Sequence, residues 1–423
     1  MQKRMVRFNR LTVAVLAVLA AIAGFVIFFS RAATPSSNPN SLGRFGMNTL
    51  AVMSGNNTQV GTVFDNLKAA DVNWIRGDFE WSVVQQNGKN SFDWSREDVM
   101  VAQAVSHHIN VLATLDYTPA WARTNQSSDK YPPDNVADYA AYVSAAVTRY
   151  KASVHYWELW NEPNNATFWQ PSPNVAAYTA LLKAGYAAAK AADPTATVIS
   201  AGLSPGSGTS DPRTFLQGMY DNNGGTSTGL FDAVGWHPYC DAINPVTSTD
   251  EWCSWYRMSG TTPSARSIMT AAGDSNKLIW PTEYGVCTNG TGGATGSEAT
   301  QAADLTAAYN GAGQTSWLGP LFWYEFQDVS TDTSSNFFNF CGLLNFNGTK
   351  KQSWTAFQSL AAQDTSGPVT GDVNGDGKVN ILDLSVLASH YGATGATLAQ
   401  GDVNGDGVVN ISDLSIIAAH WTG

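Results

Sequence analysis

The stretch VHYWELWNEPNN, from Val154 to Asn165, decides the fold. Its first part is a short apolar run, interrupted only by Glu158, and aromatic residues of this kind favour a β-strand. The run then stops in a polar cluster that holds Glu162 between Asn161 and Pro163. The sequence therefore predicts a strand with a carboxylate at its end, beside two tryptophans.

The same pattern of a short strand followed by a helix repeats along the chain from Arg44 to Ala362. Helical candidates such as 136–150 and 176–192 are rich in alanine and have apolar residues at i, i+3 and i+4 spacing. Eight such units predict a (β/α)8 TIM barrel, an α/β fold, and no Gly-x-Gly-x-x-Gly pattern follows the first strand to indicate a doubly wound sheet. The predicted strands lie at 44–50, 72–81, 110–117, 154–162, 197–204, 231–239, 277–286 and 318–326.

Composition narrows the range of partners. The chain has 423 residues, of which 43% are hydrophobic and 13% charged, so it can bury one large core and still carry a small second domain. Its formal charge is −11, and no basic run lies outside the first ten residues, which argues against binding to nucleic acid. We therefore expect a neutral partner, and the many tryptophan and tyrosine rings could stack on sugars.

The N-terminus reads as an export element. Basic residues among the first ten precede an uncharged apolar run from Leu11 to Phe29. Cleavage after Ala33 would place Arg31 where a small residue is preferred, so we favour an uncleaved membrane anchor over a cleaved signal peptide, and both alternatives stay open. Either one predicts an extracellular protein, secreted or anchored to the outer face of the cytoplasmic membrane, with membrane contact only through this segment.

Four cysteines lie in the exported part, and none belongs to a Cys-x-x-Cys pair, so disulfides are favoured over a metal site. We prefer Cys240 with Cys253, which closes one local loop, and Cys287 with Cys341. The other pairings and free buried thiols remain alternatives.

Glu162 has a counterpart in Glu283, which follows the apolar start of IWPTEYG at the predicted end of strand seven. In a closed barrel, strands four and seven can face each other across the mouth where functional loops gather. Two carboxyl groups so placed suit glycoside hydrolysis, in which one protonated carboxyl donates a proton and one carboxylate attacks the anomeric carbon. The tryptophans beside Glu162 favour its protonated form, whereas Arg76 and Tyr239 could hold Glu283 ionised.

These motifs carry a resemblance to a known group. WNEPN at 160–164, PTEYG at 281–285, IRGDFEW at 75–81 and WHPY at 236–239 resemble the clan A glycoside hydrolases, family 39 first and family 5 next. The resemblance implies a retaining mechanism without a cofactor, with Glu162 as acid/base and Glu283 as nucleophile, on a polysaccharide or oligosaccharide. It also assigns Asn161 to the sugar 2-hydroxyl, Arg76 and Tyr239 to holding Glu283, His237 to lining the subsite and Trp323 to the stacking floor.

Other readings of the same residues stay open. Arg76 could instead pair with Asp78 or Glu80, and Trp323 could be packing at the top of the barrel. Glu158, lower on strand four, is expected in a polar layer inside the barrel. Asp116 and Glu325 are the acids that would substitute if the strand assignment were shifted. A barrel that only binds glycan, or a cell-surface scaffold protein, is the alternative function.

The C-terminus contains an internal repeat, GDVNGDGKVNILDLSVLASHYG from Gly371 and GDVNGDGVVNISDLSIIAAHWTG from Gly401. Each copy has oxygen ligands at loop positions 1, 3, 5, 9 and 12, a glycine at 6 and a backbone carbonyl at 7, as calcium loops do. Two Ca2+ ions are therefore predicted. The ligands would be Asp372, Asn374, Asp376, Lys378, Asn380 and Asp383 in the first loop, and Asp402, Asn404, Asp406, Val408, Asn410 and Asp413 in the second.

The last ligand of each loop is aspartate, and no helix pattern precedes the first loop, so the repeat departs from the EF-hand. It resembles type I dockerin modules, which implies a cohesin-type scaffold protein as partner. Loop positions 10 and 11, which set partner choice in dockerins, are more apolar here than the familiar Ser/Thr pairs. The predicted organisation is an N-terminal segment at 1–33, a catalytic barrel at 34–365, a linker at 366–370 and a dockerin-like domain at 371–423.

Overall fold

The structure, a computed structural model, describes residues 39–49, 57–364, 371, 373, 379–396, 400–404 and 407–421. The predicted N-terminal segment and linker lie outside these residues, as do the predicted calcium ligands Asp372, Asn374, Asp376, Lys378 and Asp406. Within the described ranges, no helix combines the length and apolar character that crossing a membrane requires.

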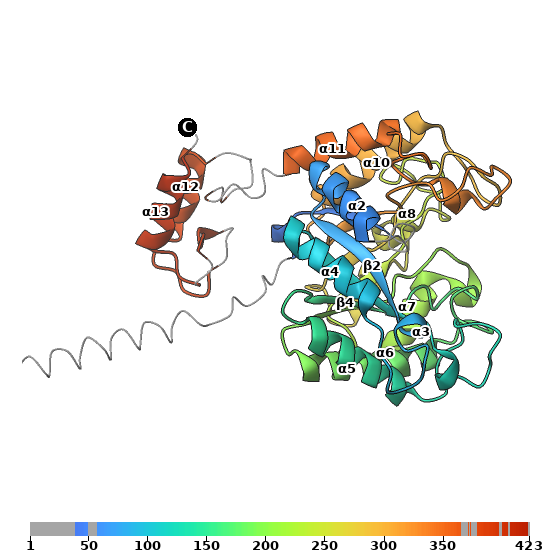
Figure 1. The fold of residues 1–423 in the computed structure, drawn as a ribbon. Coiled ribbons are helices and arrows are strands. Elements are labelled where there is room, and N and C mark those ends of the chain that lie inside the picture. Colours follow the sequence, from blue (N-terminus) through green and yellow to red (C-terminus); the bar gives the residue numbers. More distant parts are fainter. Residues whose placement is uncertain are drawn as a thin grey trace, which may run out of the picture. The chain divides into compact units, whose positions relative to one another are not determined.

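The described residues up to 364 contain eight parallel strands, which confirms the predicted barrel. Figure 1 labels two of them, β2 and β4, among the surrounding helices. Six of them pair in the order β5-β4-β3-β2-β1-β8, and β6 pairs with β7. Parallel bridges from Ile199 to Ala233 and from Ile279 to Leu318 connect these two groups, so the sheet curls into a closed ring. The strands are β1 (Phe45–Asn48), β2 (Trp74–Glu80), β3 (Asn110–Asp116), β4 (Tyr156–Leu159), β5 (Thr197–Ser200), β6 (Val234–Trp236), β7 (Ile279–Pro281) and β8 (Leu321–Trp323).

Helices surround the sheet and bury one face each against it. Helix α5 shows why: Tyr139, Tyr142 and Val143 recur at helical spacing and are fully buried, and the Asn135 side chain caps the first turn by accepting from the Ala137 backbone N–H. The helices of the barrel are α2 (Asn57–Ala69), α3 (Trp81–Val84), α4 (Ser95–His107), α5 (Val136–Tyr150), α6 (Val175–Ala192), α7 (Pro212–Asp221), α8 (Ser254–Ser259), α9 (Ala265–Ala271), α10 (Glu298–Gly313) and α11 (Gln352–Asp364).

Apolar side chains fill the barrel interior near the start of the strands, and polar side chains occupy the layer nearer the strand ends. Side chains of one strand face alternate sides, so on β2 the residues Trp74, Arg76 and Asp78 share the inner face. Trp74 belongs to a buried aromatic and aliphatic plug. In the next layer, Arg76 and Thr114 both donate to Glu158, which confirms the expected polar layer. The plug consists of Trp74, Leu112, Tyr156, Ile199, Ala233, Trp280 and Phe322.

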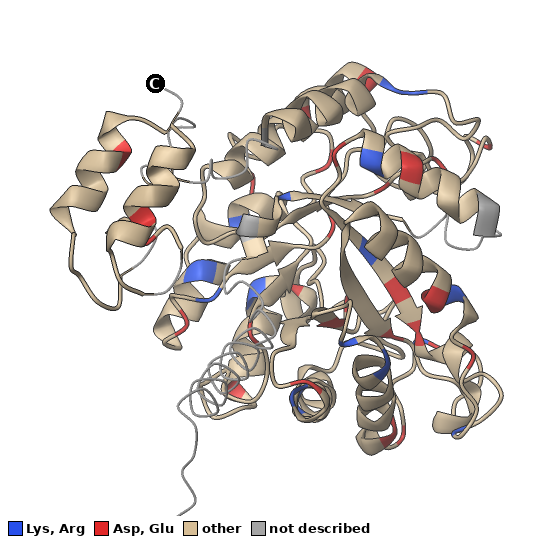
Figure 2. Ribbon diagram, turned by 60° about the vertical axis from the view of Figure 1, so that its left-hand side comes forward, with Lys and Arg blue, Asp and Glu red and all other residues tan. Residues whose placement is uncertain are grey.

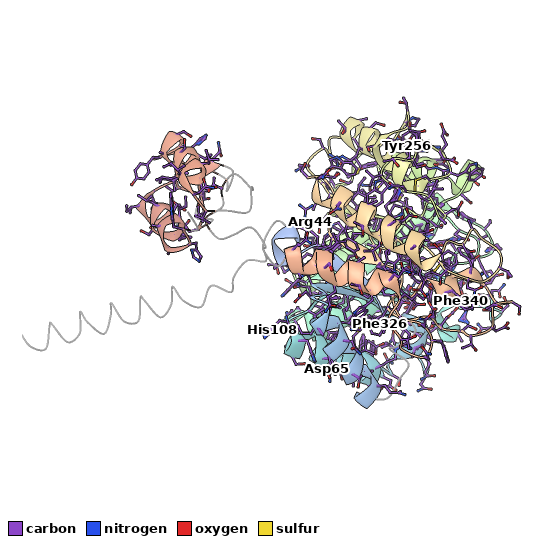
Figure 3. All side chains as sticks on the ribbon, turned by 90° about the horizontal axis from the view of Figure 1, so that it is seen from above. Arg44, Asp65, His108, Tyr256, Phe326 and Phe340 are labelled. Carbon is purple, nitrogen blue, oxygen red and sulfur yellow. A yellow bond between two sulfur atoms is a disulfide. The ribbon has the colours of Figure 1, made fainter. Side chains whose placement is uncertain are left out.

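Two disulfides, Cys240–Cys253 and Cys287–Cys341, match the preferred pairing. The second joins the segment after β7 to the segment after β8, near the 3-10 helix η4 (Phe337–Phe340). Figure 3 shows side chains filling the barrel unit, with Phe326 and Phe340 labelled on the segment that follows β8. In Figure 2 the lysine and arginine residues of the described part of the chain are scattered over several elements.

The described residues of the C-terminal repeat include one helix from each copy, α12 (Ile381–Ser389) and α13 (Ile411–Ala419). Each helix begins with the same capping box, Asn380 with Asp383 and Asn410 with Asp413. Gly407, at loop position 6, has φ +81°, a left-handed conformation that favours glycine. The small core of this unit contains Val373, Val379, Leu387, Val409 and Ile417.

Candidate active site

The end of β4 has an unusual backbone that presents Glu162. Trp160 and Glu162 have φ of 78° and 45°, which non-glycine residues rarely adopt. The surroundings fix this conformation, because the Trp160 N–H donates to the Leu115 carbonyl at 3.0 Å and the Glu162 N–H to the Gly202 carbonyl at 3.2 Å. The Trp160 ring is buried. A rigid turn therefore carries the carboxylate at the strand end.

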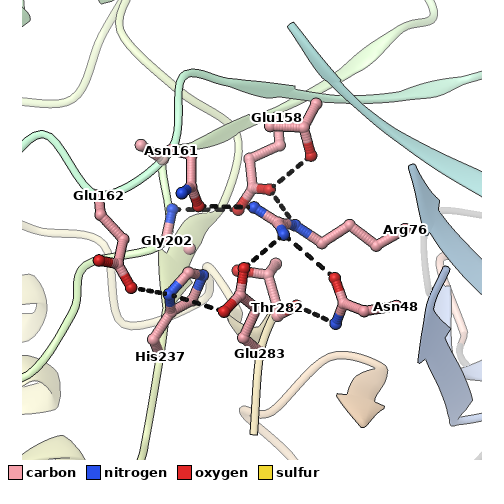
Figure 4. Close-up of polar contacts among 12 residues, drawn as sticks. Asn48, Arg76, Glu158, Asn161, Glu162, Gly202, His237, Thr282 and Glu283 are labelled. Carbon is pink, nitrogen blue, oxygen red and sulfur yellow. Dashed lines mark hydrogen bonds and ion pairs between the residues drawn. The ribbon is translucent and has the colours of Figure 1, made fainter. Parts of the chain in front are cut away.

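Glu162 lines the cavity and has two polar neighbours. Its Oε1 lies 2.8 Å from Nδ1 of His237 (Figure 4). Its Oε2 accepts from the Asn165 side-chain amide at 2.9 Å. Its exposed fraction is only 7%. The carboxyl group is thus held in one orientation, with contact to the cavity.

Glu283, at the end of β7, has a different set of partners. Arg76 Nη1 donates to its Oε1 at 2.7 Å, and the Tyr239 hydroxyl donates to its Oε2 at 2.9 Å. A guanidinium and a phenol hydroxyl both stabilise a negative charge on this carboxylate. His237 Nδ1 lies farther from Glu283 Oε2, at 3.6 Å. Arg76, Tyr239 and Asn161 all line the cavity where the sequence placed them.

Arg76 is the centre of the polar layer. Its Nε donates to Glu158 at 2.6 Å, its Nη1 also contacts Asn48 at 3.1 Å, and its Nη2 donates to Asn161 at 2.9 Å (Figure 4). Burial acts to lower the pKa of Arg76, but the charges of Glu158 and Glu283 outweigh it and hold the pKa well above its usual value. The alternative pairing with Asp78 or Glu80 is replaced by these contacts.

Glu158 completes the layer below the cavity. It is fully buried, and besides Arg76 it accepts from the Thr114 hydroxyl and from the Gly202 backbone N–H, both at 3.0 Å. Glu158 does not line the cavity, and its contacts anchor the guanidinium of Arg76.

His237 lies behind the two glutamates, which corrects the expectation that it lines the subsite. Its side chain has no exposed surface, and it contacts the carboxylate oxygens instead of the cavity. Burial acts to lower the pKa of His237, but the nearby charges of Glu283 and Glu162 raise it above its ordinary value. A Cβ at Gly202 would lie 2.1 Å from His237 Nε2, so only glycine fits beside the ring.

The expectation that Trp323 forms the stacking floor is also wrong. It is fully buried, packs edge-on against Tyr284 and donates its indole N–H to the Cys341 carbonyl at 3.1 Å, so it cannot be the floor on which a sugar stacks. The next residue along the chain, Tyr324, lines the cavity. Neighbouring residues of a strand face opposite sides, so an error of one residue in the predicted register explains the difference.

The cavity has a volume of about 560 Å³ and contains residues that the sequence did not identify. Asp78 lies near the end of β2 and Tyr117 directly follows β3, and their place at strand ends was the available signal. Removal from water raises the pKa of Asp78 to about 7. Phe337 and Phe338 come from η4, for which no motif gave a signal. The spare acids Asp116 and Glu325 are buried and do not line the cavity.

Glu162, His237 and Glu283 each offer one atom to a set that lies within 4.8 Å, a geometry that a metal ion could use. The contact of Arg76 with Glu283 disfavours that reading, because a guanidinium already balances the charge of this carboxylate. The same closeness of the two carboxyl groups suits two-carboxylate chemistry on a sugar.

The second calcium loop offers oxygen donors that fit a hard cation. Asp413 is fully buried and Asp402 nearly so, and the Asp402 carboxylate accepts from the Gly407 N–H at 2.9 Å. Asp413 accepts from the Val403 N–H at 2.8 Å, as Asp383 does from the Val373 N–H at 2.7 Å in the first loop. The two loops thus share one geometry at these positions.

Comparisons with known proteins found matches to both the barrel and the C-terminal repeat. Residues 370–421 match the family model described as Dockerin type I domain. A search of the curated proteins finds no match to the chain. Type I dockerin domains generally bind calcium.

Among solved structures, a family 39 glycoside hydrolase from the gut symbiont Bacteroides cellulosilyticus has a TM-score of 0.59 at 22% identity, covering 76% of this chain and 64% of that one. The chain thus spans less than two thirds of that protein. A monomeric β-xylosidase from Caulobacter crescentus gives 0.57 at 18%, covering 75% and 68%. A family 5, subfamily 18 glycoside hydrolase from Bifidobacterium longum subsp. infantis gives 0.54 at 16%, covering 76% and 79%. These similarities show that the barrel shares the (β/α)8 fold of these three proteins.

Proposed function

We propose that the barrel is a retaining glycoside hydrolase that cleaves β-glycosidic bonds of an extracellular polysaccharide. The observation that carries the proposal is the pair of carboxyl groups at the ends of β4 and β7, whose nearest ligand atoms lie within 4.8 Å. Retaining enzymes place the two carboxyl groups about 5–5.5 Å apart, whereas inverting enzymes need about 6.5–9.5 Å to admit a water.

The partners of each carboxyl group support separate roles. Glu283 is the nucleophile, because Arg76 and Tyr239 both donate to its carboxylate oxygens and orient them. Its carboxylate forms a bond to the anomeric carbon as the bond to the leaving oxygen breaks. Glu162 gives its proton to that oxygen and then removes one from the water that hydrolyses the glycosyl-enzyme. Asn161, held by Arg76, is placed to contact the sugar beside the nucleophile.

His237 and Arg76 act as positioning residues. His237 contacts Glu162 at 2.8 Å and lies 3.6 Å from Glu283, so it sets the relative orientation of the two carboxyl groups. Its burial excludes direct contact with a sugar in the cavity.

The test is turnover by the full chain on a panel of aryl β-glycosides, xylan, β-glucan and mannan, with the product anomer followed by NMR. We expect at least one substrate to be cleaved and the first-formed product to keep the β configuration. Inversion at the anomeric carbon would contradict the proposed mechanism, and inactivity across the panel would favour the alternative of a barrel that only binds glycan.

For the C-terminal module we propose attachment of the enzyme to a cohesin-type scaffold protein, with one Ca2+ in each loop. The side chains of Asp402, Asn404, Asn410 and Asp413 would contribute to the second ion, together with Asp406, which lies outside the described residues. Ile381 and Ile411 begin the two helices and are 62% and 60% exposed, so an apolar partner surface would fit them. In each repeat, the ion would hold the loop that precedes the helix.

Removing calcium should unfold the C-terminal module and leave the barrel folded. A small unit with so few core residues depends on its metal, because ion binding and folding share one free energy. Calorimetry of the full chain should show two transitions in calcium, and EDTA should lower the module's transition by more than about 10 °C. The Asp383→Ala/Asp413→Ala variant should show the same shift without EDTA. A module transition that EDTA leaves in place would contradict the calcium assignment.

A further inference from the structure

One wall of the cavity is aromatic and lies on the side of Glu283. We call Tyr239, Tyr324, Phe337 and Phe338 the aromatic wall, and all four line the cavity. The rings of Phe337 and Phe338 lie 4.2 Å apart, and Phe338 meets Tyr239 edge-on at 5.5 Å and Tyr324 edge-on at 5.9 Å. Because Tyr239 also donates to Glu283, the wall reaches the proposed nucleophile.

The two phenylalanines are only partly buried, so packing alone does not account for them. They stand in η4, on a long segment between β8 and α11 that has little regular structure of its own. Half-exposed aromatic rings at the edge of a cavity are suited to stacking on the apolar face of a sugar ring.

This segment is fastened to the segment after β7. The Cys287–Cys341 disulfide joins them, the Phe337 N–H donates to the Thr291 carbonyl at 2.9 Å, and the Thr288 N–H donates to the Phe340 carbonyl at 3.0 Å. A Cβ at Gly290 would lie 2.4 Å from the Phe337 Cα, so the two backbones touch there.

The buried ammonium group of Lys351 also contacts this junction. Lys351 is 2% exposed, and its ammonium group donates to Asp328 at 2.8 Å, to the Thr288 hydroxyl at 2.9 Å and to the Phe340 carbonyl at 3.2 Å. Buried charges with all donors satisfied fix a local geometry. The wall is therefore rigid before any ligand arrives.

The charge of the cavity limits which sugar can reach the wall. Carboxyl groups of Asp78, Glu162, Asp241 and Glu283 line it, and among the described lining residues Arg76 is the one cation. Arg76 is already engaged by Glu158 and Glu283. A uronic acid would meet repulsion without a free cation, whereas a neutral sugar would not.

We propose that the aromatic wall is a binding subsite for a neutral pyranose ring, formed chiefly by Phe337 and Phe338, and that the Cys287–Cys341 disulfide holds it in position. The inference rests on the proposed function, because it names the sugar class for the same cavity. It adds a specificity determinant beyond the paired carboxylates: oligosaccharides that extend over the wall bind more tightly than single sugars.

The test measures binding separately from hydrolysis. The full chain with Glu283→Gln is titrated calorimetrically with xylotetraose, cellotetraose, mannotetraose and tetragalacturonate. At least one neutral tetrasaccharide should bind, and tetragalacturonate should bind more weakly. Adding Phe337→Ala/Phe338→Ala should weaken the affinity for the best neutral ligand by about 10-fold or more. Phe346→Ala is the matched control, since Phe346 follows η4, is 52% exposed and does not line the cavity.

Two further variants decide the mechanism. Phe337→Tyr/Phe338→Tyr keeps the rings and should retain the affinity, so an equal loss in the tyrosine and alanine variants would overturn stacking. Cys287→Ser/Cys341→Ser should weaken binding while far-ultraviolet circular dichroism stays unchanged, and unchanged affinity would overturn the role of the disulfide.

The outcomes separate the inference from the proposed function. Affinity that the alanine variant leaves intact, tighter binding of tetragalacturonate, or no binding of any neutral tetrasaccharide would each overturn the subsite. Failure of the proposed function appears instead as absent hydrolysis by the chain with Glu283 in place, and the binding result does not depend on it.

Discussion

Replacing Glu283 by glutamine should abolish turnover, with kcat lower by a factor of about 10^4 or more. The amide is nearly the same size but cannot form the bond to the anomeric carbon. It also changes the contact with Arg76 Nη1, now 2.7 Å from a carboxylate oxygen. Rates on the best aryl β-glycoside, measured for wild type and variant side by side, check this result.

The matched variant is Glu162→Gln, which removes the proton donor at the other strand end. Its loss should depend on the leaving group: about 10²- to 10⁴-fold for an alkyl or sugar leaving group, and much smaller in the glycosylation step for dinitrophenol, which leaves without a proton. An equal loss with both leaving groups would contradict the acid role. Turnover by Glu283→Gln close to that of wild type would refute the nucleophile assignment.

Replacing Arg76 by methionine should lower the free energy of unfolding by about 3–5 kcal/mol, the range for breaking a buried ion pair by removing one partner. Methionine fills part of the space but leaves Glu158 and Glu283 without their cation. Chemical unfolding of the full chain near pH 7, followed by tryptophan fluorescence, measures the loss. Activity should fall as well, because Glu283 loses a donor.

A second substitution distinguishes the charge effect from a packing effect. In Arg76→Met/Glu158→Gln one buried carboxylate is neutral, so part of the lost stability should return, and a double-mutant cycle gives the coupling. Lysine at position 76 should not restore it, since one ammonium cannot reach the oxygens of Glu158, Asn161 and Glu283 together. A loss below about 1 kcal/mol in Arg76→Met would show that the ion pairs add little.

The fold followed from the sequence to a large extent. Periodicity located all eight strands, because parallel strands covered on both faces read as compact apolar runs between amphipathic helices. Glu162 and Glu283 were recognisable because each follows such a run, and the structure brings them together, while their chemical roles stay predictions. Both disulfides agree with the preferred pairing.

The remaining features of the site depend on register and on loops. Trp323 and Tyr324 differ by one position, and periodicity defines strand ends too loosely to decide which of them faces the cavity. His237 was expected at the cavity surface, but its depth behind the carboxylates is a matter of packing. Phe337 and Phe338 reach the cavity from a long segment that the Cys287–Cys341 disulfide and contacts of Lys351 join to its neighbours, and although the sequence favoured that disulfide, no motif placed the two rings at the cavity.

The contacts of Arg76 also bear on when the chain becomes active. Asn48, Glu158 and Glu283 reach this one guanidinium from β1, β4 and β7, and the contact with Glu283 spans 207 positions of the chain. Such a network forms only after the ring of strands has closed. A chain that is still folding therefore has no assembled pair of carboxyl groups, and the proposed activity would arise only with the completed barrel.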